Sequence, residues 1–310
     1  MTVSLVGRRI AILGFGNQGA AHATLLRAAG LEVVVGARPG GAGAARARAE
    51  GFAVHELAEA VALGNVVAML LPDEALPALW DSLASRLGAG QTLVFAHGFN
   101  LLYGGLALPA DCDVVLVSPT APGRVMARAR ERDERIPAYL AAHQDASGVA
   151  WDLAAAYAEA LCCGPLLRTT VREETEVDLF GEQVVLCGGM NALVVAAWET
   201  LVGRGYSPEL AYLECVHQLR FLAELLQERG PAGFRGAISG TARYGDLTRG
   251  PRIIGPSSRA AMEAVLDEIR DGSFAREWQA EVAAGGRRLE ALTEAARRHP
   301  IEAVRLRALG

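Results

Sequence analysis

RRIAILGFGNQGAAHATLL, residues 8–26, joins a short apolar run to a helical pattern through a glycine-rich turn. The turn has the form G-x-G-x-x-G, which in this position permits a tight bend and lets the backbone approach a pyrophosphate closely. The helix that follows would present amide groups and a partial positive charge to the same phosphates. The stretch predicts a dinucleotide-binding domain, and its cofactor-binding residues would be Gly14, Phe15, Gly16, Asn17, Gln18 and Gly19.

Short β-branched runs alternate with helical patterns through the first half of the chain. Such alternation predicts an α/β fold with a parallel, doubly wound sheet of the Rossmann type over residues 1–169. From residue 170 the pattern changes to long helical segments without strand runs, which predicts an all-α domain over residues 170–310. The strand runs are RRIAILGFG, LEVVVGAR, NVVAMLLP, TLVFAHG, DVVLVSP, IPAYLAAHQD and LLRTTV.

The composition is that of a globular protein with a large core, since 51% of the 310 residues are hydrophobic. The formal net charge is -5, all the strong cations are arginines and none form a dense stripe, which gives no support for nucleic-acid binding. No apolar stretch reaches the roughly 18 residues of a membrane span, and the N-terminus runs directly into a strand pattern. We therefore expect a cytoplasmic protein that binds neither nucleic acid nor membrane.

The end of the second strand run bears on the choice of dinucleotide. Arg38 stands where many NAD-binding proteins carry an acid for the ribose hydroxyls, and an arginine there could bind a 2′-phosphate. The next five residues, 39–43, contain no serine or threonine that would share such a phosphate. The stretch favours NAD(H) and leaves NADP(H) open.

EVDLFGEQ, residues 176–183, places the carboxylates of Asp178 and Glu182 four residues apart, on one face of a helix. Such a pair is often a solvated stripe. Here the apolar run at residues 184–198 follows directly, which predicts a helix buried on most of its circumference. A buried pair of like charges is costly without a cation, and Mg²⁺ is the natural candidate.

Several motifs together, GFGNQG, LLPDE, FAHGFN, EVDLFGEQ, AYLEC and GDLTRGPRII, resemble the short class of the ketol-acid reductoisomerase family, in order, from about residue 8 to 300. The resemblance implies two Mg²⁺ ions, a nicotinamide cofactor and a knotted helical domain. It also implies a homodimer with shared active sites, which in some cases assembles further. The family rearranges a 2-acetyl-2-hydroxy acid by an alkyl shift and reduces the resulting 2-keto acid.

Roles for single residues follow from the same resemblance. Asp178 would bridge the two metals, Glu182 would bind one of them, and Glu214 from the second chain would bind the other. Ser239 would hold the substrate carboxylate. His97, which taken alone reads equally well as a packed loop histidine, would lie where nicotinamide and substrate meet. The LLPDE motif adds three cofactor-binding residues, Leu71, Pro72 and Asp73.

Two expected catalytic positions depart from the family pattern. Thr120 stands in place of a lysine, and Gln218 stands in place of a second glutamate, so one positive and one negative group are absent together. Glutamine can form hydrogen bonds but cannot ionise. Further departures from the family are Ala121, Arg124, Gly240 and Arg243.

The retained ligands with altered residues between them predict a remodelled paralogue of specialised metabolism, with metals and cofactor kept and a different hydroxy or dihydroxy acid as substrate. The chain resembles one such branch of the family, which forms a cyclopropanol from a sulfonium-bearing dihydroxy acid. An authentic ketol-acid reductoisomerase of valine and isoleucine synthesis is the alternative. A non-catalytic nucleotide-binding sensor is the second alternative.

Overall fold

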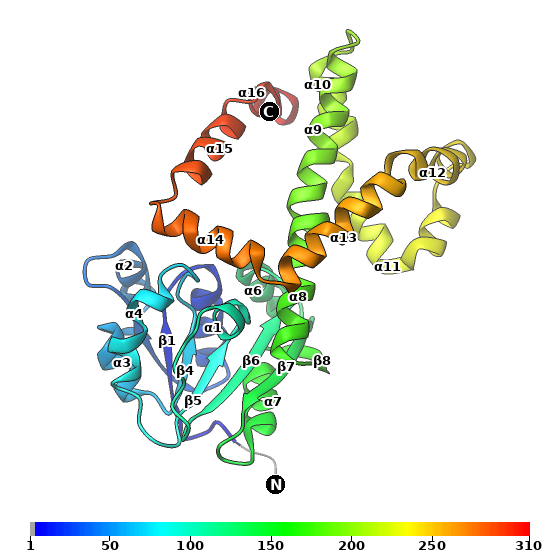
Figure 1. The fold of residues 1–310 in the computed structure, drawn as a ribbon. Helices are drawn as coiled ribbons and strands as arrows, with labels where there is room; N and C mark the ends of the chain where they lie inside the picture. The colour runs from blue at the N-terminus through cyan, green and yellow to red at the C-terminus, as the bar shows by residue number, and fades with distance from the viewer. Residues whose placement is uncertain (1–3) are drawn as a thin grey trace. The chain divides into compact units, whose positions relative to one another are not determined.

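The computed structural model describes residues 4–310 of the chain (Figure 1). It contains two compact units, one up to Val177 and one from Asp178 to Gly310. The boundary falls inside a single helix, α8 (Val171–Gly181). Each unit is described by itself.

The first unit is built on one eight-stranded sheet with the order β3-β2-β1-β4-β5-β6-β7-β8. All neighbours from β3 to β6 run parallel, which confirms the doubly wound pattern. The order reverses between β1 and β4, the place where such sheets bind nucleotides. The strands are β1 (Arg9–Leu13), β2 (Glu32–Gly36), β3 (Ala53–His55), β4 (Val66–Met69), β5 (Thr92–Phe95), β6 (Asp113–Pro119), β7 (Ile136–Gln144) and β8 (Cys163–Arg168).

Strand β7 departs from the parallel pattern, because it pairs antiparallel with β6. Helix α6 (Gly123–Glu131) lies in the connection. The chain nevertheless re-enters the sheet beside the end of β6, where Thr120 N donates to Pro137 O at 2.9 Å. The connection therefore leaves the sheet and returns at the same end of β6. Strand β7 consequently runs antiparallel to β6.

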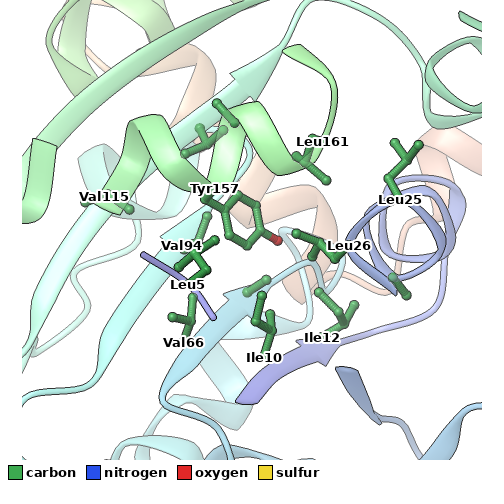
Figure 2. Packing of buried hydrophobic residues seen from close by; sticks show 14 of the residues in the cluster. Leu5, Ile10, Ile12, Leu25, Leu26, Val66, Val94, Val115, Tyr157 and Leu161 are labelled. Carbon is green, nitrogen blue, oxygen red and sulfur yellow. The ribbon is translucent and has the colours of Figure 1, made fainter. Parts of the chain in front are cut away.

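Helices cover both faces of this sheet, and the alternation of β1 separates two cores. Ile10 and Ile12 face one cluster, whereas Ala11 and Leu13 face the other. Figure 2 shows the first cluster around Tyr157. Each fully buried aliphatic side chain contributes about 1.5–3 kcal/mol to folding. The helices are α1 (Asn17–Ala28), α2 (Ala42–Ala49), α3 (Leu57–Leu63), α4 (Leu76–Ala84), α5 (Phe99–Tyr103), α6, α7 (Ala150–Ala160) and the start of α8.

The second unit is entirely helical over its described residues, as the sequence predicts. Its buried cluster joins α9, α10 and α16 through Trp198, Tyr212 and Ile301, and Trp198 Nε1 donates to Pro208 O at 3.0 Å. The elements are η1 (Glu182–Leu186), α9 (Gly188–Val202), α10 (Pro208–Tyr212), η2 (Leu213–His217), α11 (Leu219–Ala237), α12 (Gly240–Ile253), α13 (Pro256–Arg270), α14 (Ser273–Ala283), α15 (Arg287–Arg297) and α16 (Pro300–Leu309).

The apolar run after Glu182 is largely exposed in the single chain, so the expected burial of this helix is wrong there. Val185, Leu186 and Leu193 are 57%, 61% and 52% exposed. The expectation that no segment matches a membrane span is also corrected, because Val171–Val202 is long and apolar enough by length and composition. The reason is that α8, η1 and α9 continue as one helix past the carboxylates.

We predict that His22 makes the stability of the first unit sensitive to acid. His22 on α1 is fully buried, with Nδ1 3.1 Å from Tyr157 Oη, and burial lowers its pKa from 6.5 to about 3. Between these values the unfolded chain binds a proton that the folded chain does not, so the free energy of unfolding falls as pH falls, by up to about 1.4 kcal/mol per pH unit. Denaturant titrations from pH 7.5 to 4.5 should show this loss, and His22→Gln should remove it. The same substitution at exposed His143 is the control; equal slopes in wild type and His22→Gln would contradict the prediction.

Candidate functional site

The glycine turn after β1 forms a cradle that fits a dinucleotide pyrophosphate. A β-carbon at Gly14 would lie 2.6 Å from Leu70 O, and one at Gly19 would lie 2.0 Å from Gly14 O. Both positions therefore require close approach of main chain to main chain. At Gly16 a β-carbon would meet nothing within 4 Å, which leaves this side of the turn open to a ligand. The amides at the start of α1 follow directly.

The other expected cofactor residues of this unit lie at the same edge of the sheet. Parallel strands end at a common edge, so the segments after β2, β4 and β5 meet beside the turn. Arg38 follows β2 and is exposed. Asn100 on α5 donates to Asp73 Oδ1 at 2.8 Å and to Asp73 O at 3.2 Å, which ties the LLPDE segment to the FAHGFN segment. Leu71 and Pro72 lie in the same segment, directly before Asp73.

His97 lies beside a buried carboxylate. Its Nδ1 is 3.5 Å from Oε1 of Glu174, a residue only 3% exposed. The other carboxylate oxygen, Oε2, accepts from Gly98 N at 3.1 Å and from the hydroxyl of Thr175 at 3.3 Å. A carboxylate held in this way can orient the imidazole. The role of His97 where nicotinamide and substrate meet stays a prediction.

Gly98 makes this arrangement possible. A β-carbon there would lie 2.1 Å from Thr175 Oγ1 and 3.2 Å from Glu174 Oε2, so no larger residue lets α8 approach the loop after β5. The glycine of the FAHGFN motif is therefore a packing requirement of the site.

Glu174 is a site residue that the sequence reasoning missed. A signal for it exists, because Glu174, Asp178 and Glu182 are spaced four apart along one helical stripe. Glu174 and Asp178 each offer a carboxylate oxygen within 4.8 Å of the other along α8. The stripe of carboxylates is one member longer than expected.

Two of the expected metal ligands lie in π-helical turns. Glu182 opens η1, where Cys187 N donates to Glu182 O at 2.9 Å, five residues apart. Glu214 lies in η2, where Gln218 N donates to Leu213 O at 3.3 Å. Single π turns of this kind are rare and often mark functional sites.

The side chain of Gln218 is bound to Glu214. Its Nε2 donates to Glu214 Oε2 at 2.6 Å, and both residues belong to the same helical turn. An amide donor keeps this carboxylate an acceptor and leaves its other oxygen for a cation. Gln218 consequently serves as a hydrogen-bond partner of an expected ligand.

The side chain of Thr120 carries no charge, and its hydroxyl hydrogen is used in a hydrogen bond. Its hydroxyl donates to Pro137 O at 2.9 Å, within the excursion between β6 and β7. Although Thr120 is exposed at the carboxyl end of β6, its hydroxyl hydrogen is already committed to the backbone.

Ser239 caps helix α12. Its Oγ accepts from Ala242 N at 3.2 Å, which leaves the hydroxyl hydrogen able to donate. The amides and the positive end of this 14-residue helix favour an anion at the same place. The carboxylate-binding role that the resemblance implies for Ser239 stays a prediction.

Comparison with known proteins assigns the family. The model described as "Acetohydroxy acid isomeroreductase, NADPH-binding domain" matches residues 4–165, and "Ketol-acid reductoisomerase, C-terminal domain" matches residues 171–309. The chain belongs to the ketol-acid reductoisomerase family. As such it is an oxidoreductase and isomerase that uses a nicotinamide cofactor.

Solved structures agree with this assignment. An NADH-preferring ketol-acid reductoisomerase from an uncultured archean is 37% identical with a TM-score of 0.95, over 99% of this chain and 96% of that one. A semialdehyde dehydrogenase NAD-binding protein from Cupriavidus necator is 19% identical (TM-score 0.66, 86% and 99% covered). A pyrroline-5-carboxylate reductase from Coxiella burnetii is 15% identical (TM-score 0.59, 85% and 96% covered). The last two share the fold alone.

The expected metal ligands of this reductoisomerase fit Mg²⁺ by chemistry. Asp178, Glu182 and Glu214 supply only carboxylate oxygens, the donors that this small, hard ion prefers. Two ions held by three carboxylates would keep positions for a chelating substrate. Within residues 4–310, no group of three or more candidate ligands includes Glu182 or Glu214.

We predict that Gly189 is needed for the π turn that presents Glu182. A β-carbon at Gly189 would lie 1.8 Å from Val184 O, five residues earlier, so Gly189→Ala must unwind η1. We expect it to lower the free energy of unfolding by about 1–3 kcal/mol and to weaken Mg²⁺ binding in calorimetry. Gly236→Ala on α11, where a β-carbon meets nothing within 4 Å, is the matched control. Identical behaviour of the two variants would show that the turn tolerates a side chain.

Proposed function

We propose that this reductoisomerase homologue uses two Mg²⁺ ions and NAD(H) on a metal-chelating hydroxy or dihydroxy acid outside valine and isoleucine synthesis. The observation that carries the proposal is the hydrogen bonding of Thr120 and Gln218, whose polar groups contact Pro137 O and Glu214. Neither residue can supply the ionised group that stands at its position in the family.

The two replacements remove charge chemistry from the site while the expected ligands stay. A lysine can donate a proton or hold a developing negative charge, and a glutamate can carry a proton between oxygens. Thr120 and Gln218 can do neither at neutral pH. The alkyl shift would lose this assistance, whereas hydride transfer to a metal-held carbonyl needs mainly positioning and polarisation.

Support for NAD(H) comes from the end of β2. Arg38 is exposed, and residues 39–43 offer no hydroxyl to share a 2′-phosphate with it. The archaeal reductoisomerase that is 37% identical is NADH-preferring. Both observations favour NAD(H) over NADP(H) for this chain.

Cyclopropanol formation is the finer form of the proposal. The substrate would be a dihydroxy acid that carries a sulfonium group. Oxidation of one hydroxyl, with hydride passing to NAD⁺, would acidify the neighbouring carbon. Loss of that proton and attack of the carbon on the carbon bearing sulfur would close the ring and release a neutral sulfide. Return of the hydride and one proton to the ketone would give the cyclopropanol, with no net oxidation.

An authentic reductoisomerase is the competing function, since the family and the ligands are the same. The test is turnover of 2-acetolactate and of its 2-keto acid isomer by the purified protein, with NADH or NADPH and with or without Mg²⁺. We expect no turnover of acetolactate and Mg²⁺-dependent reduction of the keto acid, faster with NADH. Thr120→Lys combined with Gln218→Glu should make acetolactate turnover measurable, at least tenfold above the assay background.

Other outcomes of this assay decide against the proposal. Equal turnover of both substrates by the wild-type protein would make it a housekeeping reductoisomerase. Cofactor binding without turnover of any hydroxy acid and without dependence on Mg²⁺ would make it a nucleotide-binding sensor. Unchanged sulfonium substrate after incubation with Mg²⁺ and NAD⁺ would eliminate cyclopropanol formation alone.

We further propose that the chain acts in the cytoplasm as a homodimer whose second copy covers the exposed apolar face of residues 171–202. Only 6% of the most apolar window of this helix is buried in the single chain. Light scattering without detergent should give twice the chain mass of 32.6 kDa, or an even multiple. A monomer, or sedimentation of the protein with liposomes, would overturn the proposal.

A further inference from the structure

Arg46 on helix α2 forms hydrogen bonds with the backbone of the dinucleotide turn. One of its guanidinium nitrogens, Nη2, donates both to Phe15 O and to Gly16 O, the latter at 3.0 Å. Its Cζ lies 5.2 Å from the centre of the Phe15 ring. A cation 30 residues away in sequence thus binds two consecutive carbonyls of the G-x-G-x-x-G turn.

The Phe15 side chain is buried next to this contact. It is 4% exposed and meets Phe52 edge to face, with ring centres 5.6 Å apart. Arg27 from the end of α1 covers the Phe52 ring at 3.8 Å and donates to Glu50 O at 2.8 Å. Two arginines and two aromatic rings therefore fix the second residue of the turn between α1 and α2.

The contact has a direct electrostatic consequence for a bound pyrophosphate. Carbonyl oxygens carry partial negative charge and repel phosphate oxygens unless they are paired. Gly16 O already accepts from Ala20 N at 3.1 Å, so Arg46 acts chiefly on the Phe15 carbonyl. The guanidinium engages the Phe15 and Gly16 carbonyls and adds a full positive charge beside the anion site. The amide groups of the turn and of the start of α1 then remain for the ligand.

We propose that Arg46 is a positioning residue for the nicotinamide dinucleotide, acting through the backbone of the turn. The proposal rests on the cofactor use proposed above. A brace of this kind affects NADH and NADPH alike, since both carry the same pyrophosphate. An arginine that read the 2′-phosphate would affect NADPH alone.

The experiment compares Arg46→Met, Arg46→Lys and Arg48→Met in the full-length protein. Arg48 is exposed on the same helix and loses the same charge, but no hydrogen bond joins its side chain to the turn within residues 4–310. Kd values for NADH and NADPH are measured by nucleotide fluorescence, alongside thermal unfolding of the free protein and the cofactor KM and kcat of keto-acid reduction.

We expect Arg46→Met to raise the Kd and KM of both cofactors about tenfold, since hydrogen bonds to a charged group are lost, with kcat within twofold of wild type. Arg46→Lys should recover part of the affinity, and Arg48→Met should leave both Kd values within twofold. Weakening of NADPH alone, or of neither cofactor, would overturn the bracing role while cofactor use stands. Equal weakening by Arg46→Met and Arg48→Met would reduce the effect to bulk charge and overturn it too. Binding of neither nucleotide by the wild-type protein would overturn the cofactor proposal and the role of Arg46 with it.

Discussion

The contact between Glu174 and the backbone of Gly98 is the interaction on which the rest of the site depends. Burying a carboxylate is costly unless its oxygens are bound, and here one oxygen accepts from the Gly98 amide and the Thr175 hydroxyl. The contact fixes the start of α8 against the loop that carries His97. Because the stripe of carboxylates continues along this helix, the same contact also sets where that stripe begins.

Beyond α8, the expected metal ligands Glu182 and Glu214 lie in departures from regular helix. A π turn widens the helix by one residue, so it redirects the side chains that follow relative to those before it. Only glycine fits at positions 188 and 189, because a β-carbon at either position would clash with the carbonyl of Gln183 or Val184. The helix is locally less regular at both π turns, the one with Glu182 and the one with Glu214.

Much of this was predictable from sequence because it rests on short-range periodicity. Alternating runs predict the sheet, and the glycine turn predicts the cofactor edge. The backward β7 was not predictable, since its direction depends on where the chain re-enters the sheet. Nor were the π turns, because a single turn of five residues is too short to change the hydrophobic pattern of the helix around it. Glu174 could have been found from its spacing, but its burial depends on Gly98, 76 residues away.

The neutral residues at the two altered positions keep hydrogen-bond partners although they carry no charge. Thr120 and Gln218 are exposed, and each forms a hydrogen bond, to Pro137 O and to Glu214, so the change leaves no buried donor or acceptor unpaired. Where lysine is absent, a substrate that carries its own positive charge meets no fixed cation at this position and avoids the repulsion that lysine would impose. The proposed sulfonium substrate and the proposed loss of the alkyl shift therefore follow from the same replacement.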